Sequence, residues 1–202
     1  MHDTTSHNLL ALYTQIATLK LLPRIGWLQR GVPNAESVAE HTFGVATLAL
    51  LIGDTIDGLD RGKLLAIAML HDLAEALLSD LPASAKRFIG SDHKHAAERS
   101  ALEEMLAKLP NRAEYLALWD EYARGCSREA RLVKSIDRIE MLAQALAYER
   151  AGSRALGEFW EDIDDGWGDE FPVLRELAAE IMERRTASLS LPFFQGQERA
   201  ER

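Results

Sequence analysis

One histidine and two acids near the middle of the chain have the types and spacing of a cation site. His71 and Asp72 are adjacent, and Glu75 follows three residues later. On a helix, with about 100° per residue, the three side chains occupy one narrow arc. An imidazole and a carboxylate suit a divalent cation, and a second carboxylate beside them can orient or deprotonate water. The alternative is a hydrogen-bonded core histidine beside two solvated acids, because so short a motif also occurs by accident.

A second histidine lies on an apolar stripe upstream. His41, Val45, Leu48 and Ile52 follow the i, i+4, i+7, i+11 spacing of one helix face, so we expect His41 to point inward. A buried imidazole needs a partner for each ring nitrogen, and a metal ion together with a hydrogen-bond acceptor supplies both. A core histidine satisfied by protein groups alone is the alternative.

A third acid lies far downstream on a long predicted helix. Asp137 shares one face with Met141, Gln144 and Tyr148. An unpaired carboxylate on such a face is costly, so Asp137 needs a cationic partner. That partner is either Lys134 or an arginine, or a metal ion.

Considered together, the four candidate ligands come from three predicted helices. They are His41, His71, Asp72 and Asp137. Two imidazole nitrogens and two carboxylates form a mixed site that leaves positions open for water and substrate. The combination favours a metal centre more strongly than any one of these residues does.

The elements that must position these residues are helices. Apolar residues recur at helical spacing along most of the chain, and no sustained alternation predicts a strand. Pro23 stops the first helix, and Ser37 with Glu40 forms a capping box that starts the second. The predicted helices span about 6–22, 37–57, 61–78, 92–108, 111–124, 127–151 and 170–189, with a loop at 152–169. The sequence therefore predicts an all-α helical bundle.

The composition and charge of the chain argue against several classes of protein. The 202 residues are 47% hydrophobic, enough for one domain over 1–202 with one core. The net charge of −9 argues against a nucleic-acid polymer as partner. The longest largely apolar run, 43–53, is shorter than the roughly 20 residues that cross a bilayer, so we expect no membrane role. A single cysteine and an N-terminus without a signal pattern predict a cytoplasmic protein.

The ordered motifs resemble those of a known family, the HD-superfamily phosphohydrolases, and within it the 5′-deoxynucleotidase branch. The family pattern is an upstream histidine, a His-Asp pair and a distant aspartate. The matching blocks are Pro23–Trp27, Glu36–His41, His71–Glu75, Asp80–Pro82 with Lys86, Lys134–Asp137 with Glu140, Gln144–Glu149 and Gly157–Trp160. The resemblance covers residues 8–186, which would form a single HD domain followed by a tail at 187–202. Many relatives have glycine where this chain has Ser79.

The resemblance implies roles for individual residues. His41, His71, Asp72 and Asp137 would hold a divalent ion, with Mn, Co, Mg, Fe, Ni and Zn all acceptable to such a ligand set. Asp72 and Glu75 would be catalytic, with Glu75 activating water, and a second ion could bind near Glu75 and Asp80. The expected substrate contacts are Arg24, Trp27, Asp80, Leu81 and Lys86. A guanidinium can grip a phosphate bidentately, and an indole can lie against a sugar or base.

The implied activity is metal-dependent hydrolysis of deoxynucleoside 5′-monophosphates to deoxynucleoside and phosphate. A phosphodiesterase or nucleoside triphosphohydrolase with the same ligands is one alternative, and a non-catalytic nucleotide-binding HD module is another. A di-iron oxygenase would need further histidines, and the two available, His93 and His95, lie about 200° apart on a helix. The family also implies a possible homodimer, for which the apolar segment 189–194 is a candidate docking tail.

Overall fold

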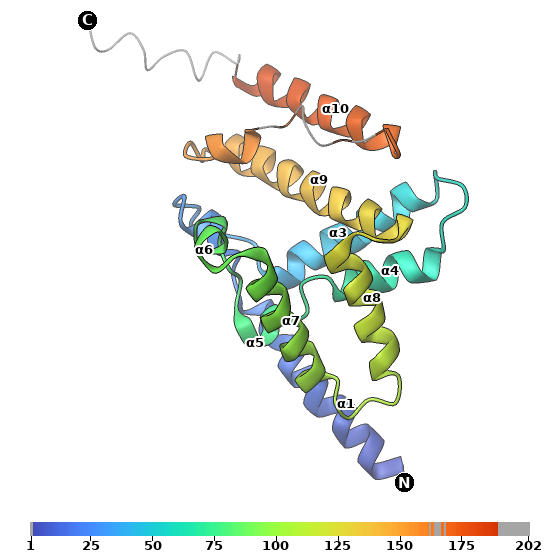
Figure 1. Ribbon diagram of the computed structural model, residues 1–202. Coiled ribbons are helices and arrows are strands. Elements are labelled where there is room, and N and C mark those ends of the chain that lie inside the picture. Colours follow the sequence, from blue (N-terminus) through green and yellow to red (C-terminus); the bar gives the residue numbers. More distant parts are fainter. Residues whose placement is uncertain (1, 162, 164–166, 168, 190–202) are drawn as a thin grey trace, which may run out of the picture. The chain divides into compact units, whose positions relative to one another are not determined.

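The described part of the chain is built from helices. A computed structural model describes residues 2–161, 163, 167 and 169–189, and these residues contain no β-strand (Figure 1). Their one extended pairing is an isolated antiparallel bridge between Pro23 and Ser37. The all-α prediction is confirmed. The chain divides into two compact units, residues 1–136 and 137–202.

The first unit runs from the N-terminus into the start of the longest helix. Its elements are α1 (His2–Ile16), the 3-10 helix η1 (Ala17–Lys20), α2 (Ile25–Leu28), α3 (Val38–Gly53), α4 (Arg61–Leu70), α5 (Glu75–Leu78), α6 (Ala83–Ile89), α7 (Ser91–Met105) and α8 (Arg112–Arg124). Helix α9 (Arg128–Arg150) starts in this unit and continues into the second.

Local sequence signals set several helix ends. The predicted capping box is present: Ser37 accepts from the Glu40 amide, and the Glu40 carboxylate accepts from the Ser37 amide. Asp60 caps α4 by accepting from the Lys63 amide at 2.9 Å. Helix α8 ends at Gly125, whose φ of 62° lies in the left-handed region that favours glycine.

Helices α3 and α4 pack closely against each other; α3 carries His41, and α4 ends directly before His71. Gly53 of α3 allows this close approach because it has no side chain. A Cβ atom at this position would lie only 2.5 Å from Leu64 Cδ2 on α4. A core formed by η1, α3, α7, α8 and residues 73–74 includes Leu19, Val38, Leu73, Leu102 and Trp119. The histidine-bearing helices are thereby fixed to a rigid frame.

The predicted helix over 61–78 is wrong in its middle. Helix α4 ends at Leu70, residues 71–74 form a turn, and α5 begins at Glu75. The Glu75 amide donates to the Asp72 carbonyl at 3.0 Å instead of to the His71 carbonyl, which accepts from the Trp119 indole. A tertiary hydrogen bond therefore replaces one helical hydrogen bond at the His-Asp pair.

Other boundaries also differ from the predictions. The first helix begins at His2, before the expected start, and its last turns form η1. Two short helices, α2 and α6, lie in stretches that the pattern left unassigned. Residues 190–202, which include most of the predicted tail, lie outside the described residues.

The second unit contains the rest of α9, the 3-10 helix η2 (Gly157–Trp160) and α10 (Pro172–Leu189). Glu149 on α9 joins the three elements. Its carboxylate accepts from Arg185 Nε at 2.8 Å and Nη2 at 3.0 Å, and from Trp160 Nε1 at 3.0 Å. The Arg185 guanidinium also lies 4.3 Å from the Trp160 ring centre.

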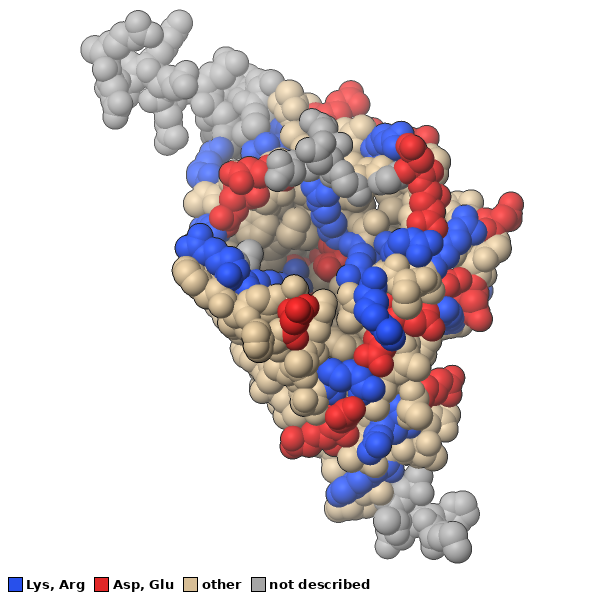
Figure 2. Space-filling model, in the orientation of Figure 1, with Lys and Arg blue, Asp and Glu red and all other residues tan. Residues whose placement is uncertain are grey.

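The face of the molecule drawn in Figure 2 carries charges of both signs. Figure 2 shows acidic and basic side chains interspersed on the visible face, rather than one large basic area. Among the described residues, none of the helices has the length and apolarity to cross a membrane.

Candidate metal centre

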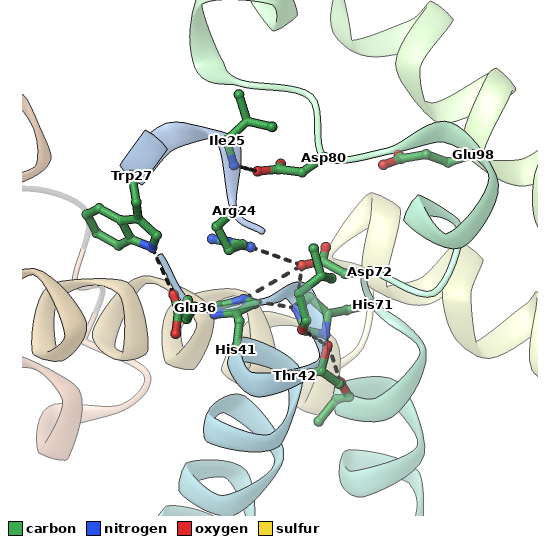
Figure 3. Close-up of polar contacts among 12 residues, drawn as sticks. Arg24, Ile25, Trp27, Glu36, His41, Thr42, His71, Asp72, Asp80 and Glu98 are labelled. Atoms are coloured by element: carbon green, nitrogen blue, oxygen red, sulfur yellow. Dashed lines mark hydrogen bonds and ion pairs between the residues drawn. The ribbon is translucent and has the colours of Figure 1, made fainter. Parts of the chain in front are cut away.

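Two imidazoles meet one carboxylate at the junction of α3, α4 and the 71–74 turn (Figure 3). Asp72 Oδ2 lies 3.2 Å from His71 Nε2 and 3.6 Å from His41 Nε2. The two Nε2 atoms are 3.4 Å apart. His41 is fully buried, as its place on the apolar stripe predicts, and His71 is only 2% exposed.

The hydrogen bond made by His71 Nδ1 determines which nitrogen of the His71 ring is available to bind a cation. His71 Nδ1 lies 2.7 Å from the Ala68 carbonyl oxygen, which can only accept. Nδ1 therefore carries the hydrogen, and in the neutral ring the Nε2 lone pair faces Asp72 and His41. The His71 lone pair and the ionised Asp72 oxygen repel each other in this buried space unless a cation lies between them. The donor set fits a divalent ion that accepts nitrogen and oxygen ligands.

Two aromatic residues of α8 support His71. Trp119 Nε1 donates to the His71 carbonyl at 3.3 Å, and the Tyr122 ring is edge-on to the imidazole with centroids 5.6 Å apart. Neither residue was predicted from the sequence. Their i, i+3 spacing on a predicted helix was the available signal, because it places both on one face.

Asp72 is held in its ionised form. Burial opposes that form, but in the metal-free protein positive charge on the neighbouring His71, Arg24 and His41 side chains holds the pKa of the Asp72 carboxyl well below its usual range. Arg24 Nη1 lies 3.2 Å from the same oxygen, Oδ2, that faces the two imidazoles. Three nitrogen-bearing side chains thus share a single carboxylate oxygen.

Glu75 has the opposite surroundings. The residue is 6% exposed, and its Oε2 has no hydrogen-bond partner among the described residues. Burial, together with the nearby charges of Asp72 and Asp80, raises the pKa of Glu75 to about 9, although Arg24 and Lys86 act the other way. A buried acid with an unused oxygen is suited to exchanging a proton with a ligand.

Asp80 follows the single described non-glycine residue with positive φ. Ser79 has φ 68° and ψ 164°, a conformation that is essentially restricted to glycine. This turn directs Asp80 toward the Arg24 segment, where its Oδ2 accepts from the Ile25 amide at 2.7 Å. The serine therefore keeps the glycine-like backbone that positions Asp80.

Arg24 and Trp27 belong to a loop whose two ends are joined. The Val38 amide donates to the Leu22 carbonyl at 2.8 Å, and the Arg24 amide donates to the Glu36 carbonyl at 2.9 Å. The Glu36 side chain, missed by the sequence analysis, accepts from Trp27 Nε1 at 2.9 Å. Trp27 is 1% exposed in this arrangement, and its predicted contact with substrate stays a prediction.

The remaining predicted residues lie around this cluster or beyond the first unit. Lys86 is on α6 and exposed, with its charge close enough to affect Glu75, and Leu81 precedes that helix. Asp137 is on α9 and is the first residue of the second unit, directly after the buried Ile136. Its role as a fourth ligand stays a prediction.

Sequence comparison places these residues in a family. A profile described as HD domain matches residues 16–170, a range that contains every predicted ligand. The chain belongs to the HD domain family. The HD match runs across the boundary between the two compact units, so both contribute residues to the matched range.

Curated relatives of this HD protein carry one activity in their names. The 5′-deoxynucleotidase HDDC2 of Homo sapiens is 31% identical over 189 residues, covering 92% of this chain and 90% of the human protein. The 5′-deoxynucleotidase hdd1 of Schizosaccharomyces pombe is 32% identical over 152 residues, covering 71% of this chain and 75% of its own.

Two solved structures of other proteins share the fold. A conserved hypothetical protein from Pyrococcus furiosus superposes with a TM-score of 0.76 at 38% identity, covering 86% of this chain and 99% of its own. A predicted metal-dependent phosphohydrolase from Magnetospirillum magnetotacticum has a TM-score of 0.65 at 24% identity, covering 88% and 93%. At that identity the second likeness supports the fold alone.

Proposed function

We propose that this protein is a metal-dependent phosphohydrolase that converts deoxynucleoside 5′-monophosphates to deoxynucleosides and phosphate. The observation that carries the proposal is the convergence of His41, His71 and Asp72 on one point, beside a buried Glu75 with an unused oxygen. The substrate class rests on the relatives, two of which are named 5′-deoxynucleotidases and align over most of this chain.

In this proposal His41, His71, Asp72 and Asp137 hold one divalent ion. When bound, the ion supplies positive charge to the phosphoryl oxygens and lowers the pKa of a water molecule. Mn, Co, Mg, Fe, Ni and Zn all accept imidazole and carboxylate ligands. A second ion near Glu75 and Asp80 is a further element of the proposal, since both carboxylates are buried there.

Glu75 accepts the proton of the attacking water. The pKa of Glu75 falls when positive charge is bound beside it, and the ionised carboxylate is the form that acts as a base. Its Oε2 is available for this purpose, whereas Asp72 Oδ2 is engaged by three nitrogens. No covalent phosphoenzyme is needed, because water attacks phosphorus directly.

Arg24 and Lys86 bind the phosphate, and Asp80 and Leu81 contact the substrate or the second ion. Arg24 precedes Glu75 in the sequence and Lys86 follows it. Both side chains act to lower the pKa of Glu75, so both positive charges lie near the reacting group. Trp27 contributes by holding the Arg24 loop through Glu36. Discrimination against ribonucleotides requires crowding at the 2′ position, which costs a misplaced hydroxyl about 1–3 kcal/mol, or about ten- to a hundredfold.

The decisive experiment compares kcat/KM for dAMP, AMP, dTMP and 3′-dAMP under one saturating metal. We expect the two deoxynucleoside 5′-monophosphates to be preferred. Equal values for dAMP and AMP contradict deoxy selectivity, and absence of phosphate release from all four contradicts the nucleotidase assignment. Release from cyclic nucleotides or triphosphates instead identifies the alternative phosphohydrolase classes.

The assembly state is a separate proposal. We infer a homodimer from the family resemblance alone, and light scattering coupled to size-exclusion chromatography tests it by molar mass. A monomeric mass at micromolar concentration contradicts it.

A further inference from the structure

The Arg24 guanidinium and the proposed ion draw on one carboxylate oxygen. Asp72 Oδ2 lies 3.2 Å from Arg24 Nη1, the same distance as from His71 Nε2, and 3.6 Å from His41 Nε2 (Figure 3). We infer that Arg24 makes metal binding and phosphate binding interdependent: it competes with the divalent ion for Asp72, and the ion, by taking Oδ2, releases the guanidinium toward phosphate. This inference rests on the proposed function.

The backbone of Arg24 is fixed, so only its side chain can respond. The Arg24 amide is bonded to the Glu36 carbonyl, and the next amide, of Ile25, is bonded to Asp80 Oδ2. The bridge between Pro23 and Ser37 precedes it. With its base held at these points, the guanidinium can move between Asp72 and a ligand without displacing the loop.

The side chain also has room to make that movement. The Arg24 and Asp72 side chains are 17% and 16% exposed, whereas both histidine side chains are 0% exposed. The imidazoles are therefore enclosed by protein, but the arginine and its carboxylate partner border solvent. Of the three groups on Oδ2, the arginine is the one that can exchange.

Charge decides the direction of the effect. A guanidinium beside a ligand oxygen repels a divalent cation and uses a lone pair of that oxygen, so it weakens metal binding. A purely structural Arg24, needed only to hold Asp72 in place, has the opposite effect, because its loss lets the ligand move. The two roles therefore predict opposite changes in metal affinity when Arg24 is replaced.

The test measures metal affinity without turnover. Mn²⁺ is titrated calorimetrically into the chelator-stripped full chain, as wild type, Arg24→Gln and Arg30→Gln. Arg30 lies in the same loop, where its Nη1 donates to Gln29 Oε1 at 3.3 Å, so its replacement controls for the loss of one positive charge. We expect Arg24→Gln to bind Mn²⁺ roughly tenfold more tightly, within the usual range of coupling between two sites, and Arg30→Gln to match wild type.

Inorganic phosphate supplies the second readout. We expect Mn²⁺ to raise the phosphate affinity of the wild-type chain, and Arg24→Gln to lose most of that increase, because the variant lacks the guanidinium that the ion is proposed to release toward phosphate. Unchanged or weaker Mn²⁺ binding by folded Arg24→Gln overturns the inference and leaves the proposed function intact. Failure of the wild type to bind Mn²⁺ overturns both. If Arg24→Gln does not fold, Arg24→Met keeps the aliphatic stem and serves in its place.

Discussion

Glu75 in the first unit and Glu149 in the second are both shielded from solvent, but their surroundings differ. The Glu149 carboxylate accepts hydrogen bonds from Nε and Nη2 of Arg185 and from the Trp160 indole, so its charge is neutralised and both of its oxygens are used. Glu75 has an unused buried oxygen and two neighbouring carboxylates that disfavour its charge. The first arrangement stabilises a fold, whereas the second costs stability and provides a proton acceptor.

The largest expected effect comes from removing the divalent ion that is proposed to bind beside Glu75. Chelation should abolish turnover and lower the melting temperature, because an ion at 100 times its dissociation constant stabilises the folded state by about 2.7 kcal/mol. Phosphate release and thermal melting before and after readdition of Mn²⁺ measure both effects. Full turnover after verified metal removal contradicts the metal requirement.

Replacing the reactive carboxylate should separate activity from folding. Glu75→Gln should lower kcat by about 10²–10⁴-fold, the usual contribution of a general base, while keeping metal and fold. Metal content, circular dichroism and steady-state rates measure this, with the exposed Glu104→Gln on α7 as the matched control. Metal loss equal to that of Asp72→Ala assigns Glu75 as a ligand instead.

The paired carboxylate should behave in the opposite way. Glu149→Gln should lower the free energy of unfolding by about 2 kcal/mol, because Arg185 loses a charged partner, while kcat/KM of the folded enzyme stays close to wild type. Denaturant unfolding provides the measurement, with Glu183→Gln as control, because Glu183 is an exposed acid on α10, the helix that carries Arg185. A stable but inactive Glu149→Gln contradicts the distinction between the two sites.

The stability of the metal-free protein should also depend on pH. Because its pKa is raised to about 9, Glu75 holds its proton in the folded state at pH values where the unfolded chain has released it. Its contribution to stability therefore falls as pH rises from 5 toward 9, by at most about 1.4 kcal/mol per pH unit. Glu75→Gln should become increasingly more stable than wild type between pH 5 and 8, and a constant difference contradicts this.

The sequence predicted the features that depend on local spacing. The capping box of Ser37 and Glu40 is present because both partners lie within one helical turn, and His41 is buried because it lies on an apolar stripe. The helical class follows from the same periodicity. The His-Asp pair was predicted from residue type, since few side chains other than these suit a divalent ion.

The features that the sequence did not predict depend on contacts distant in the chain. The helix break at His71 requires the Trp119 indole, 48 residues away, to take the His71 carbonyl. The strained turn at Ser79 is stable only where its surroundings hold it, and the sequence alone offers a serine rather than glycine. The sharing of Asp72 Oδ2 by three nitrogens likewise appears only after folding.

The Arg24 loop can accept additional residues at its tip because hydrogen bonds join its two ends. Hydrogen bonds between Leu22 and Val38 and between Arg24 and Glu36 fix the loop at its base, while Pro33 and Asn34 at its tip are exposed. The entropic cost of closing a loop rises by only about 0.6 kcal/mol for each doubling of the loop's length. Insertions at residues 33–34 therefore leave the position of the guanidinium unchanged, so this tip is a place where a lineage can gain residues, or a probe can be attached, without disturbing the phosphate site.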